Sequence, residues 1–187
     1  LFFSTSTHKK VNVRSLDGGL TGEVLDELGD GSSVPWLRNL VVAQTYDAST
    51  SPGRTDVFGS IGAELFRLHD RRWRHAASLP STIESIALAP DFDRNPSTPG
   101  RPLVFLSMKK FPYFGILEDK NSTPAVAYYP AGLEEGSVIK IICPPDFATR
   151  PVVYAATFTD GIMKLDLSSP TPMWEHVGGD FPDYFVD

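Results

Sequence analysis

The chain has 187 residues, of which 41% are apolar and 11% aromatic, and this composition is typical of a globular domain or of a segment of a larger one. Its formal net charge of −6 argues against nonspecific nucleic-acid binding, which depends on Lys and Arg to neutralise phosphates. No run approaches the roughly 20 apolar residues that a membrane-spanning helix needs, and a single cysteine excludes a disulfide framework within the chain.

Short apolar runs bounded by Gly, Pro, Asp and Ser recur along the whole chain and predict an all-β protein. Residues 1–38 fit three strands of a unit that lacks its first strand, although the last of the three would also serve as a helical turn. Residues 39–81, 82–137 and 138–179 each fit four strands. The expected strands are, in chain order, Leu1–Thr7, Val11–Leu16, Glu23–Leu28, Asn39–Ala43, Asp56–Ser60, Glu64–Leu68, Arg72–Ala76, Ile83–Leu88, Leu103–Ser107, Tyr113–Leu117, Ala125–Tyr128, Val138–Cys143, Pro151–Thr157, Ile162–Asp166 and Met173–Val177.

The units also repeat a turn. Residues 89–92 (Ala-Pro-Asp-Phe) follow the first strand of the third unit, and residues 144–147 (Pro-Pro-Asp-Phe) follow that of the fourth, with the two phenylalanines 55 residues apart. A period of about 50 residues with four strands per period predicts a β-propeller of four-stranded blades, in which residues 1–187 supply about three complete blades and most of a fourth. Stacking such sheets face to face would bury Trp73, Trp174 and the two turn phenylalanines between neighbouring blades.

The fourth unit carries a family resemblance. Its apolar strand, Pro-Pro-Asp-Phe turn, Val-Tyr-Ala-Ala-Thr strand (153–157), Gly-Ile-Met-Lys-Leu-Asp strand (161–166) and Trp174 resemble the repeat of the BNR/sialidase-like β-propeller superfamily. The resemblance is closest to the branch of the photosystem II stability factors and the sortilin-type ectodomains. In that family an Asp-box, Ser-x-Asp-x-Gly-x-x-Trp, follows the third strand. Residues 68–73 keep its Asp and Trp without the Gly, and residues 166–174 keep them with three extra residues between.

Two functions from different classes fit this sequence. The first is a non-catalytic binding or assembly module that presents its loops to a protein or glycan partner. The alternative is a glycan-active enzyme of the sialidase or glycoside-hydrolase kind, or a fragment of one. The first is favoured because the Asp-boxes are degraded and because no Arg can be matched to the carboxylate-binding triad that the resemblance to sialidases implies. We therefore predict no catalytic and no cofactor-binding residues.

One segment suggests a metal. Asp91, Asp93 and Asn95 have the alternate spacing of a calcium loop, in which side-chain oxygens converge on one cation. Pro96 stands where such loops carry Gly, and no Glu follows at the twelfth position. A hydrogen-bonded turn is therefore the expected structure, and calcium is the one cofactor that the sequence suggests.

Residues 67–75 are rich in Arg, and strand alternation places Arg72 and Arg74 on one face with Trp73 on the other. The stretch would serve either as a patch for a polyanion or acidic partner or as a solvated outer strand, and the second is favoured. Cys143, between two apolar neighbours, is expected to be a buried, unreactive thiol.

The ends of the chain bear on ring closure. Residues 180–187 include an apolar run, 184–186, that is a candidate for the missing strand of the first unit, beside residues 1–3. Either the chain closes as a four-bladed ring or it belongs to a larger ring of six to eight blades, which is favoured. The larger ring would leave two apolar faces open, so we expect a partner chain, a second copy or the rest of the polypeptide to cover them. The glycosylation acceptor sequence at residues 121–123 favours an extracytoplasmic or secreted location.

Overall fold

The computed structural model describes residues 2–5, 11–15, 17, 20–34, 36–43, 57–69, 71–92, 103–118, 125–133 and 138–177. These residues form strands and no helix, which confirms the predicted all-β class, and none of them builds a helix able to cross a bilayer. The strands are β1 (Phe2–Thr5), β2 (Val11–Arg14), β3 (Glu23–Val24), β4 (Arg38–Val42), β5 (Val57–Ile61), β6 (Glu64–His69), β7 (Arg72–Ser78), β8 (Ile83–Leu88), β9 (Leu103–Met108), β10 (Phe114–Glu118), β11 (Ala125–Tyr128), β12 (Val138–Ile142), β13 (Val152–Thr157), β14 (Ile162–Asp166) and β15 (Trp174–His176).

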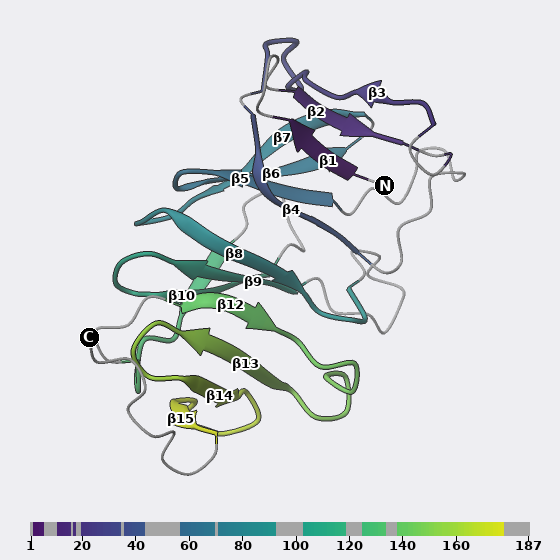
Figure 1. The fold of residues 1–187 in the computed structure, drawn as a ribbon. Coiled ribbons are helices and arrows are strands. Elements are labelled where there is room, and N and C mark those ends of the chain that lie inside the picture. Colours follow the sequence, from purple (N-terminus) through teal and green to yellow (C-terminus); the bar gives the residue numbers. More distant parts are fainter. Residues whose placement is uncertain are drawn as a thin grey trace, which may run out of the picture.

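The strands form four antiparallel sheets in chain order (Figure 1). The first sheet contains β1–β3, and the second, third and fourth contain β4–β7, β8–β11 and β12–β15. Within each sheet the strands neighbour one another in sequence order, as expected when short turns join antiparallel strands. Residues 23–28 are extended rather than helical, because Glu27 and Leu28 continue beyond β3 with isolated bridges to Ser33 and Trp73.

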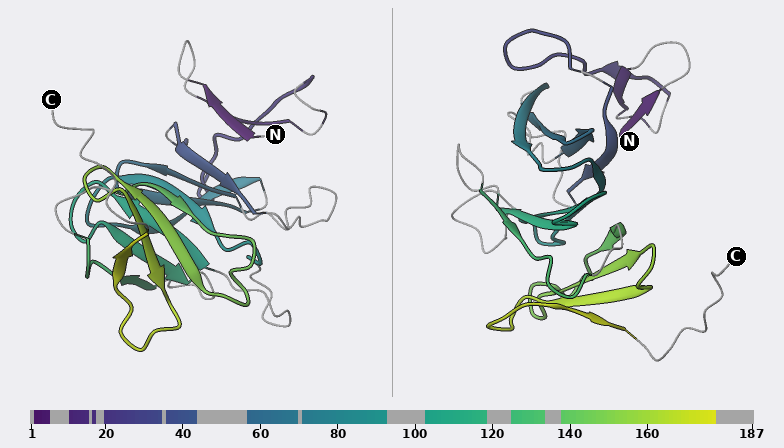
Figure 2. Two further views of the ribbon diagram at one scale, coloured as in Figure 1. Left: turned by 60° about the horizontal axis from the view of Figure 1, so that its bottom comes forward. Right: turned by 90° about the vertical axis from the view of Figure 1, so that its left-hand side faces the viewer.

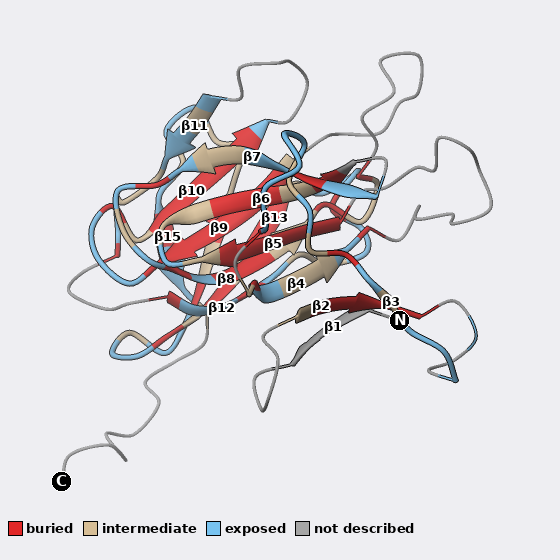
Figure 3. Ribbon diagram, turned by 90° about the horizontal axis from the view of Figure 1, so that it is seen from above, coloured by how far each residue is buried: buried red, intermediate tan, exposed pale blue. Residues whose placement is uncertain are grey.

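Consecutive sheets pack face to face along an arc, with the first and fourth sheets at its two ends (Figure 2, right). An apolar layer fills each of the three spaces between neighbouring sheets. The first layer is built around Trp73, the second around Phe58, and the third around Phe105. Burial is therefore greatest along inner parts of the middle sheets, such as β5, β9 and β10, whereas the outer strand β11 is largely exposed (Figure 3).

One ring–ring contact recurs between successive sheets. Phe58 of β5 meets Phe92 edge to face, with ring centroids 5.7 Å apart. Phe105 of β9 meets Phe147 in the same way, with centroids 5.3 Å apart. Each pair joins the second strand of one sheet to the turn after the first strand of the next, and all four rings are fully buried. The predicted burial of the turn phenylalanines is thus confirmed, and such edge-to-face pairs add about 0.5–1.5 kcal/mol beyond area burial.

A second contact recurs at the outer strands of the second and fourth sheets. The indole Nε1 of Trp73 donates to the carbonyl of Leu25 at 2.7 Å, and that of Trp174 donates to the carbonyl of Tyr129 at 3.0 Å. Leu25 and Tyr129 lie in the segments that lead into the second and the fourth sheet. The backbone N–H of Trp73 donates to the carbonyl of Glu27 in the first of these segments, and that of Trp174 to the carbonyl of Ala131 in the other. Both indoles are buried, as predicted.

The first sheet lacks an inner strand among the described residues. The second strands β5 and β9 contact the first strands β8 and β12 of the following sheets, and β1 contacts β4 in the same way. β1 therefore occupies the place of a second strand, as predicted for residues 1–38. The candidate closing strand within residues 180–187 and the acceptor sequence at 121–123 lie outside the described residues.

Candidate functional site

The turn between β9 and β10 presents an exposed aromatic ring beside two lysines. Phe111 is 66% exposed, and Lys109 and Lys110 before it are also exposed. The ring of Tyr113 meets that of Phe111 edge to face, with centroids 6.2 Å apart. The turn therefore exposes one aromatic ring directly after two positively charged side chains.

Hydrogen bonds fix this turn at both ends. Its base is closed by the Met108 N–H, which donates to the Tyr113 carbonyl at 2.7 Å. The N–H of Lys109 donates to the Thr82 carbonyl at 2.9 Å, and that of Lys110 to the Ser81 hydroxyl at 3.1 Å. Because the segment entering the third sheet holds the turn, a partner that binds Phe111 would not have to order the backbone first.

The equivalent turn of the fourth sheet, between β13 and β14, also carries an exposed ring. Phe158 is 79% exposed. The Thr157 hydroxyl donates to the Gly161 carbonyl at 3.0 Å and accepts from the Asp160 N–H at 2.8 Å, which closes this turn. Both turns lie at the left edge of the molecule in Figure 1. We call residues 109–113 and 158–161 the aromatic turns.

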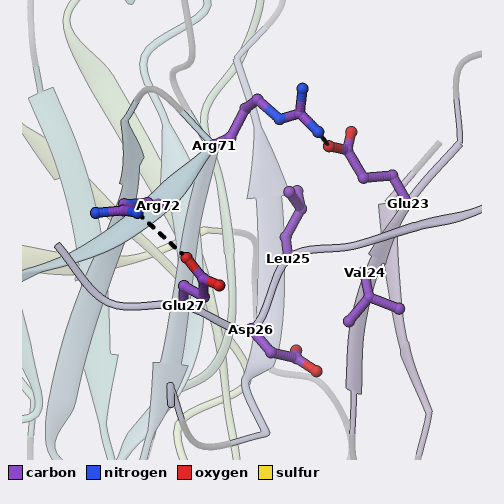
Figure 4. A pocket seen from close by; sticks show the side chains of 7 residues that line it. All are labelled: Glu23, Val24, Leu25, Asp26, Glu27, Arg71 and Arg72. Carbon is purple, nitrogen blue, oxygen red and sulfur yellow. Dashed lines mark ion pairs between the residues drawn. The ribbon is translucent and has the colours of Figure 1, made fainter. Parts of the chain in front are cut away.

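A cleft of about 330 Å³ lies between the first two sheets, lined by residues 23–27 and by Arg71 and Arg72 (Figure 4). Two ion pairs cross it: Arg71 contacts Glu23, and Arg72 Nη2 lies 3.4 Å from Glu27 Oε2. These carboxylates pair with two of the four arginines in residues 67–75. The outer-strand interpretation of that stretch is confirmed, since Arg72 is exposed and Trp73 is buried.

A serine, a histidine and a glutamate meet on the surface of β6 and β7. His75 Nε2 lies 2.6 Å from Glu64 Oε2 and 3.2 Å from Ser78 Oγ, and the Ser78 hydroxyl donates to the same glutamate oxygen at 2.7 Å. A catalytic triad needs the acid and the nucleophile at opposite ring nitrogens, whereas both approach Nε2 here. The Ser78 hydrogen bond lowers the pKa of Glu64. The cluster is therefore a surface network without triad geometry.

Of the predicted calcium ligands, Asp93 and Asn95 lie outside the described residues and Asp91 lies within them. The backbone turn is confirmed, because the Phe92 N–H donates to the Ala89 carbonyl at 2.9 Å. The Phe147 N–H donates to the Pro144 carbonyl in the same way, at 3.1 Å. The Oδ1 atom of Asp91 is buried and accepts no hydrogen bond from the described residues. The described residues contain no group of three potential metal ligands, and calcium binding stays a prediction.

Cys143 lies directly after β12 and is half-buried rather than fully buried. Burial, and then the negative charge of Asp91, raise the pKa of the thiol to about 12. The thiolate is the nucleophilic form of cysteine, and the raised pKa disfavours that form at neutral pH.

Two features were missed from the sequence. One is the Phe111 turn. Two consecutive lysines directly before an aromatic residue, between two expected strands, were the sequence signal for it. The other is the turn from β2 to β3, where Asp17 Oδ1 accepts from the Ser15 hydroxyl and the Thr21 N–H, each at 2.9 Å, and Oδ2 accepts from the Thr21 hydroxyl at 2.6 Å. Ser15-x-Asp17-x-Gly19 matches the start of the Asp-box, with Gly22 where that motif has Trp.

Asp17 should make the stability of the fold depend on pH. The Thr21 hydroxyl, the Thr21 N–H and the Ser15 hydroxyl lower the pKa of this carboxyl from 3.8 to about 2. Because the folded-state pKa is the lower one, the charged side chain stabilises the fold above about pH 4, and this contribution is lost as the pH falls toward 2. We expect Asp17→Asn to lower the urea midpoint at pH 7, and the difference from wild type to shrink between pH 4 and pH 2. A difference of constant size would assign the effect to turn geometry instead.

No protein-family model and no curated protein matches this chain. Its repeated sheet packing and its exposed aromatic turns are therefore the grounds on which a function can be proposed.

Proposed function

We propose that this chain is a segment of a BNR/sialidase-like β-propeller and serves as a non-catalytic binding module. The propeller is supported by the four consecutive meander sheets, by their face-to-face packing along an arc, and by the recurrence of the Phe–Phe and Trp–carbonyl contacts. The Asp17 turn supports the proposed family. It lies between β2 and β3, the third and fourth strands of their unit, and the Asp-box of that family follows the third strand.

The observation that carries the binding role is the presence of Phe111 and Phe158 on equivalent turns of adjacent sheets. A single exposed apolar residue is ordinary on a protein surface. Two exposed aromatic rings on hydrogen-bonded turns at one side of the molecule instead resemble the anchors of a binding surface. Lys109 and Lys110 add positive charge to this side of an otherwise acidic chain, which favours a protein or glycan partner bearing carboxylates.

The proposal can be tested by probing the immobilised 187-residue chain with a glycan array and a peptide library. We expect ligands whose affinity falls at least about tenfold in Phe111→Ala and in Phe158→Ala, as for the loss of an aromatic anchor. Met173→Ala is the matched control, because Met173 is also an exposed apolar residue but precedes β15, away from the aromatic turns.

Ligands that both phenylalanine variants retain would contradict a binding role for the aromatic turns. Hydrolysis of a fluorogenic sialoside or other glycoside by the wild-type chain would contradict a non-catalytic role and would favour the glycan-active enzyme. Thermal unfolding of each variant checks that it is folded, and substitution of exposed turn residues is expected to leave the melting temperature within a few degrees of wild type.

A further inference from the structure

The outer strand of the third sheet, β11, has an edge that no described segment covers. Among the described strands β11 pairs with β10 alone, and it is largely exposed (Figure 3). The Tyr129 N–H donates to the Phe114 carbonyl at 3.2 Å, and hydrogen-bonded pairs alternate along antiparallel strands, so the backbone of Ala127 also faces β10. The N–H and C=O groups of Val126 and Tyr128 therefore face away from the sheet. We call these four groups the third-sheet edge.

The same place in the second and fourth sheets is covered by the chain itself. The residue at this place pairs in register with a leucine of the third strand in each sheet: Trp73 with Leu68, Val126 with Leu117, and Trp174 with Leu165. The Trp73 N–H donates to the Glu27 carbonyl at 2.8 Å, and the Gly29 N–H donates to the Trp73 carbonyl at 2.9 Å. The Trp174 N–H likewise donates to the Ala131 carbonyl at 2.9 Å. Extended backbone is thus what covers an outer strand in this fold.

The segment that leads into the third sheet does not cover β11 in this way. Its Leu79 and Ile83 N–H groups donate to the turn between β5 and β6, and the Val126 N–H has no backbone partner among the described residues. Free edges are commonly protected from strand addition by charged side chains. The covered strands β7 and β15 carry such charges, for example Arg74 and Glu175, whereas β11, with the sequence Ala-Val-Ala-Tyr, has none.

The charges at one end of the third-sheet edge indicate the chemistry of a partner. Leu28 bridges β7 in parallel, so the covering segment of the second sheet runs in the same direction as β7. A segment that covered β11 in the same way would run toward Tyr128, which lies beside the start of β10. The turn of residues 109–113 leads directly into that start. The last residues of such a segment would therefore approach Lys109 and Lys110, which are both exposed.

We propose that the third-sheet edge binds an extended, acidic peptide segment of a partner protein, which runs parallel to β11 and ends beside the turn of residues 109–113. A peptide carbonyl accepts from the Val126 N–H, and the N–H two residues further along the peptide donates to the Val126 carbonyl, as Glu27 and Gly29 do at Trp73. Acidic side chains in the last part of the peptide pair with the two lysines.

This inference rests on the binding role proposed above and names the partner as a polypeptide rather than a glycan. The reason is that the edge offers backbone donors and acceptors at the spacing of a strand, which an extended peptide matches. A second copy of β11 would not supply the acidic residues, because β11 carries no charge.

The test begins with a phage-displayed library of random octapeptides, selected on the immobilised 187-residue chain. The selected peptides are expected to be enriched in Asp and Glu toward their C-terminal ends. Each backbone nitrogen of a selected peptide is then methylated in turn, and affinities are measured by fluorescence anisotropy. We expect a loss of at least about tenfold at alternate positions only, because every second N–H of an added strand faces the edge and donates to it.

Val126→Pro removes the N–H that the peptide uses, and proline is tolerated on an edge strand where that N–H faces solvent. This variant is expected to bind the selected peptides at least about tenfold more weakly than the wild type. Val126→Thr is the matched control, because it keeps the N–H and the branched side chain, and it should bind as the wild type does. Replacing Lys109 and Lys110 together by Glu should weaken the binding and reduce its dependence on salt.

Selected peptides that are indifferent to methylation at every nitrogen would overturn strand addition, and this scan needs no change in the chain. Equal binding to wild type and to a Val126→Pro variant that circular dichroism shows to be folded would also overturn it, as would a library that yields no peptide. Peptide binding that appears only in a chain truncated after Val177 would assign the edge to residues 178–187 of the chain and overturn the partner.

The same measurements keep the two proposals apart. Glycan ligands that depend on Phe111 and Phe158, together with a library that yields no peptide, would contradict only the strand addition. Peptides that add to β11 and bind both phenylalanine variants as tightly as the wild type would contradict only the role of the aromatic turns.

Discussion

Replacing Trp174 with alanine is expected to lower the free energy of unfolding by about 3–5 kcal/mol, as for other buried aromatic side chains truncated in a packed core. The indole is buried, and it meets Phe114 edge to face with ring centroids 5.0 Å apart. Its Nε1 donates to the Tyr129 carbonyl at 3.0 Å, so truncation also removes a bond between the fourth sheet and the segment that enters it. Urea unfolding monitored by circular dichroism measures the loss.

Trp174→Phe separates the ring from the hydrogen bond. Phenylalanine keeps most of the contact with Phe114 but has no N–H for the Tyr129 carbonyl, so we expect a smaller loss, about 1–3 kcal/mol. A loss below about 1 kcal/mol in Trp174→Ala would mean that the side chain is not buried in the third apolar layer, and the register of β15 against β14 would be wrong.

Gly132→Ala is expected to be the second severe substitution. Gly132 has a φ of +86°, and a Cβ added there would overlap the Trp174 carbonyl oxygen and lie 3.0 Å from the Trp174 carbonyl carbon and amide nitrogen. These are backbone atoms of a strand, so they cannot move aside as a side chain would. The expected loss of stability is at least about 3 kcal/mol, the sum of an unfavourable backbone conformation and a steric overlap.

Gly31→Ala is the matched control for this effect. Gly31 has nearly the same φ, +85°, but a Cβ added there would meet no atom within 4 Å. Its alanine variant therefore reports the cost of the left-handed backbone alone, about 1–2 kcal/mol. Equal losses in the two variants, measured by the same urea titration, would show that the segment before the fourth sheet shifts to accept the methyl group.

The repeated contacts also differ from unit to unit. The outer strand of the third sheet, β11, has no tryptophan, and the segment entering that sheet is held differently. There the Leu79 N–H donates to the Ala63 carbonyl at 2.9 Å and the Ile83 N–H to the Gly62 carbonyl at 2.8 Å, both at the turn from β5 to β6. Backbone hydrogen bonds thus hold the segment that leads into the third sheet, whereas tryptophan side chains hold the segments that lead into the second and fourth sheets.

The sequence by itself determined the strands of this protein and the residues buried between its sheets. Strand alternation and the Gly, Pro and Asp breakers are local signals, and they placed elements such as β9, β13 and β14 within one or two residues of their observed bounds. The burial of Trp73, Trp174, Phe92 and Phe147 also followed from the sequence, because large aromatic residues at repeated positions are stabilised chiefly by removal from water.

The tertiary structure alone decided which charges are paired and which apolar residues stay exposed. Arg71 and Arg72 are paired with Glu23 of β3 and with Glu27 just after that strand, more than 40 residues earlier in the sequence. Ile142 is exposed, whereas the residues at its place in the two preceding sheets, Val41 and Ala87, are partly buried against the following apolar layer. Pairing and exposure depend on how the sheets are stacked, and that non-local arrangement is not encoded in the spacing of residues along any one strand.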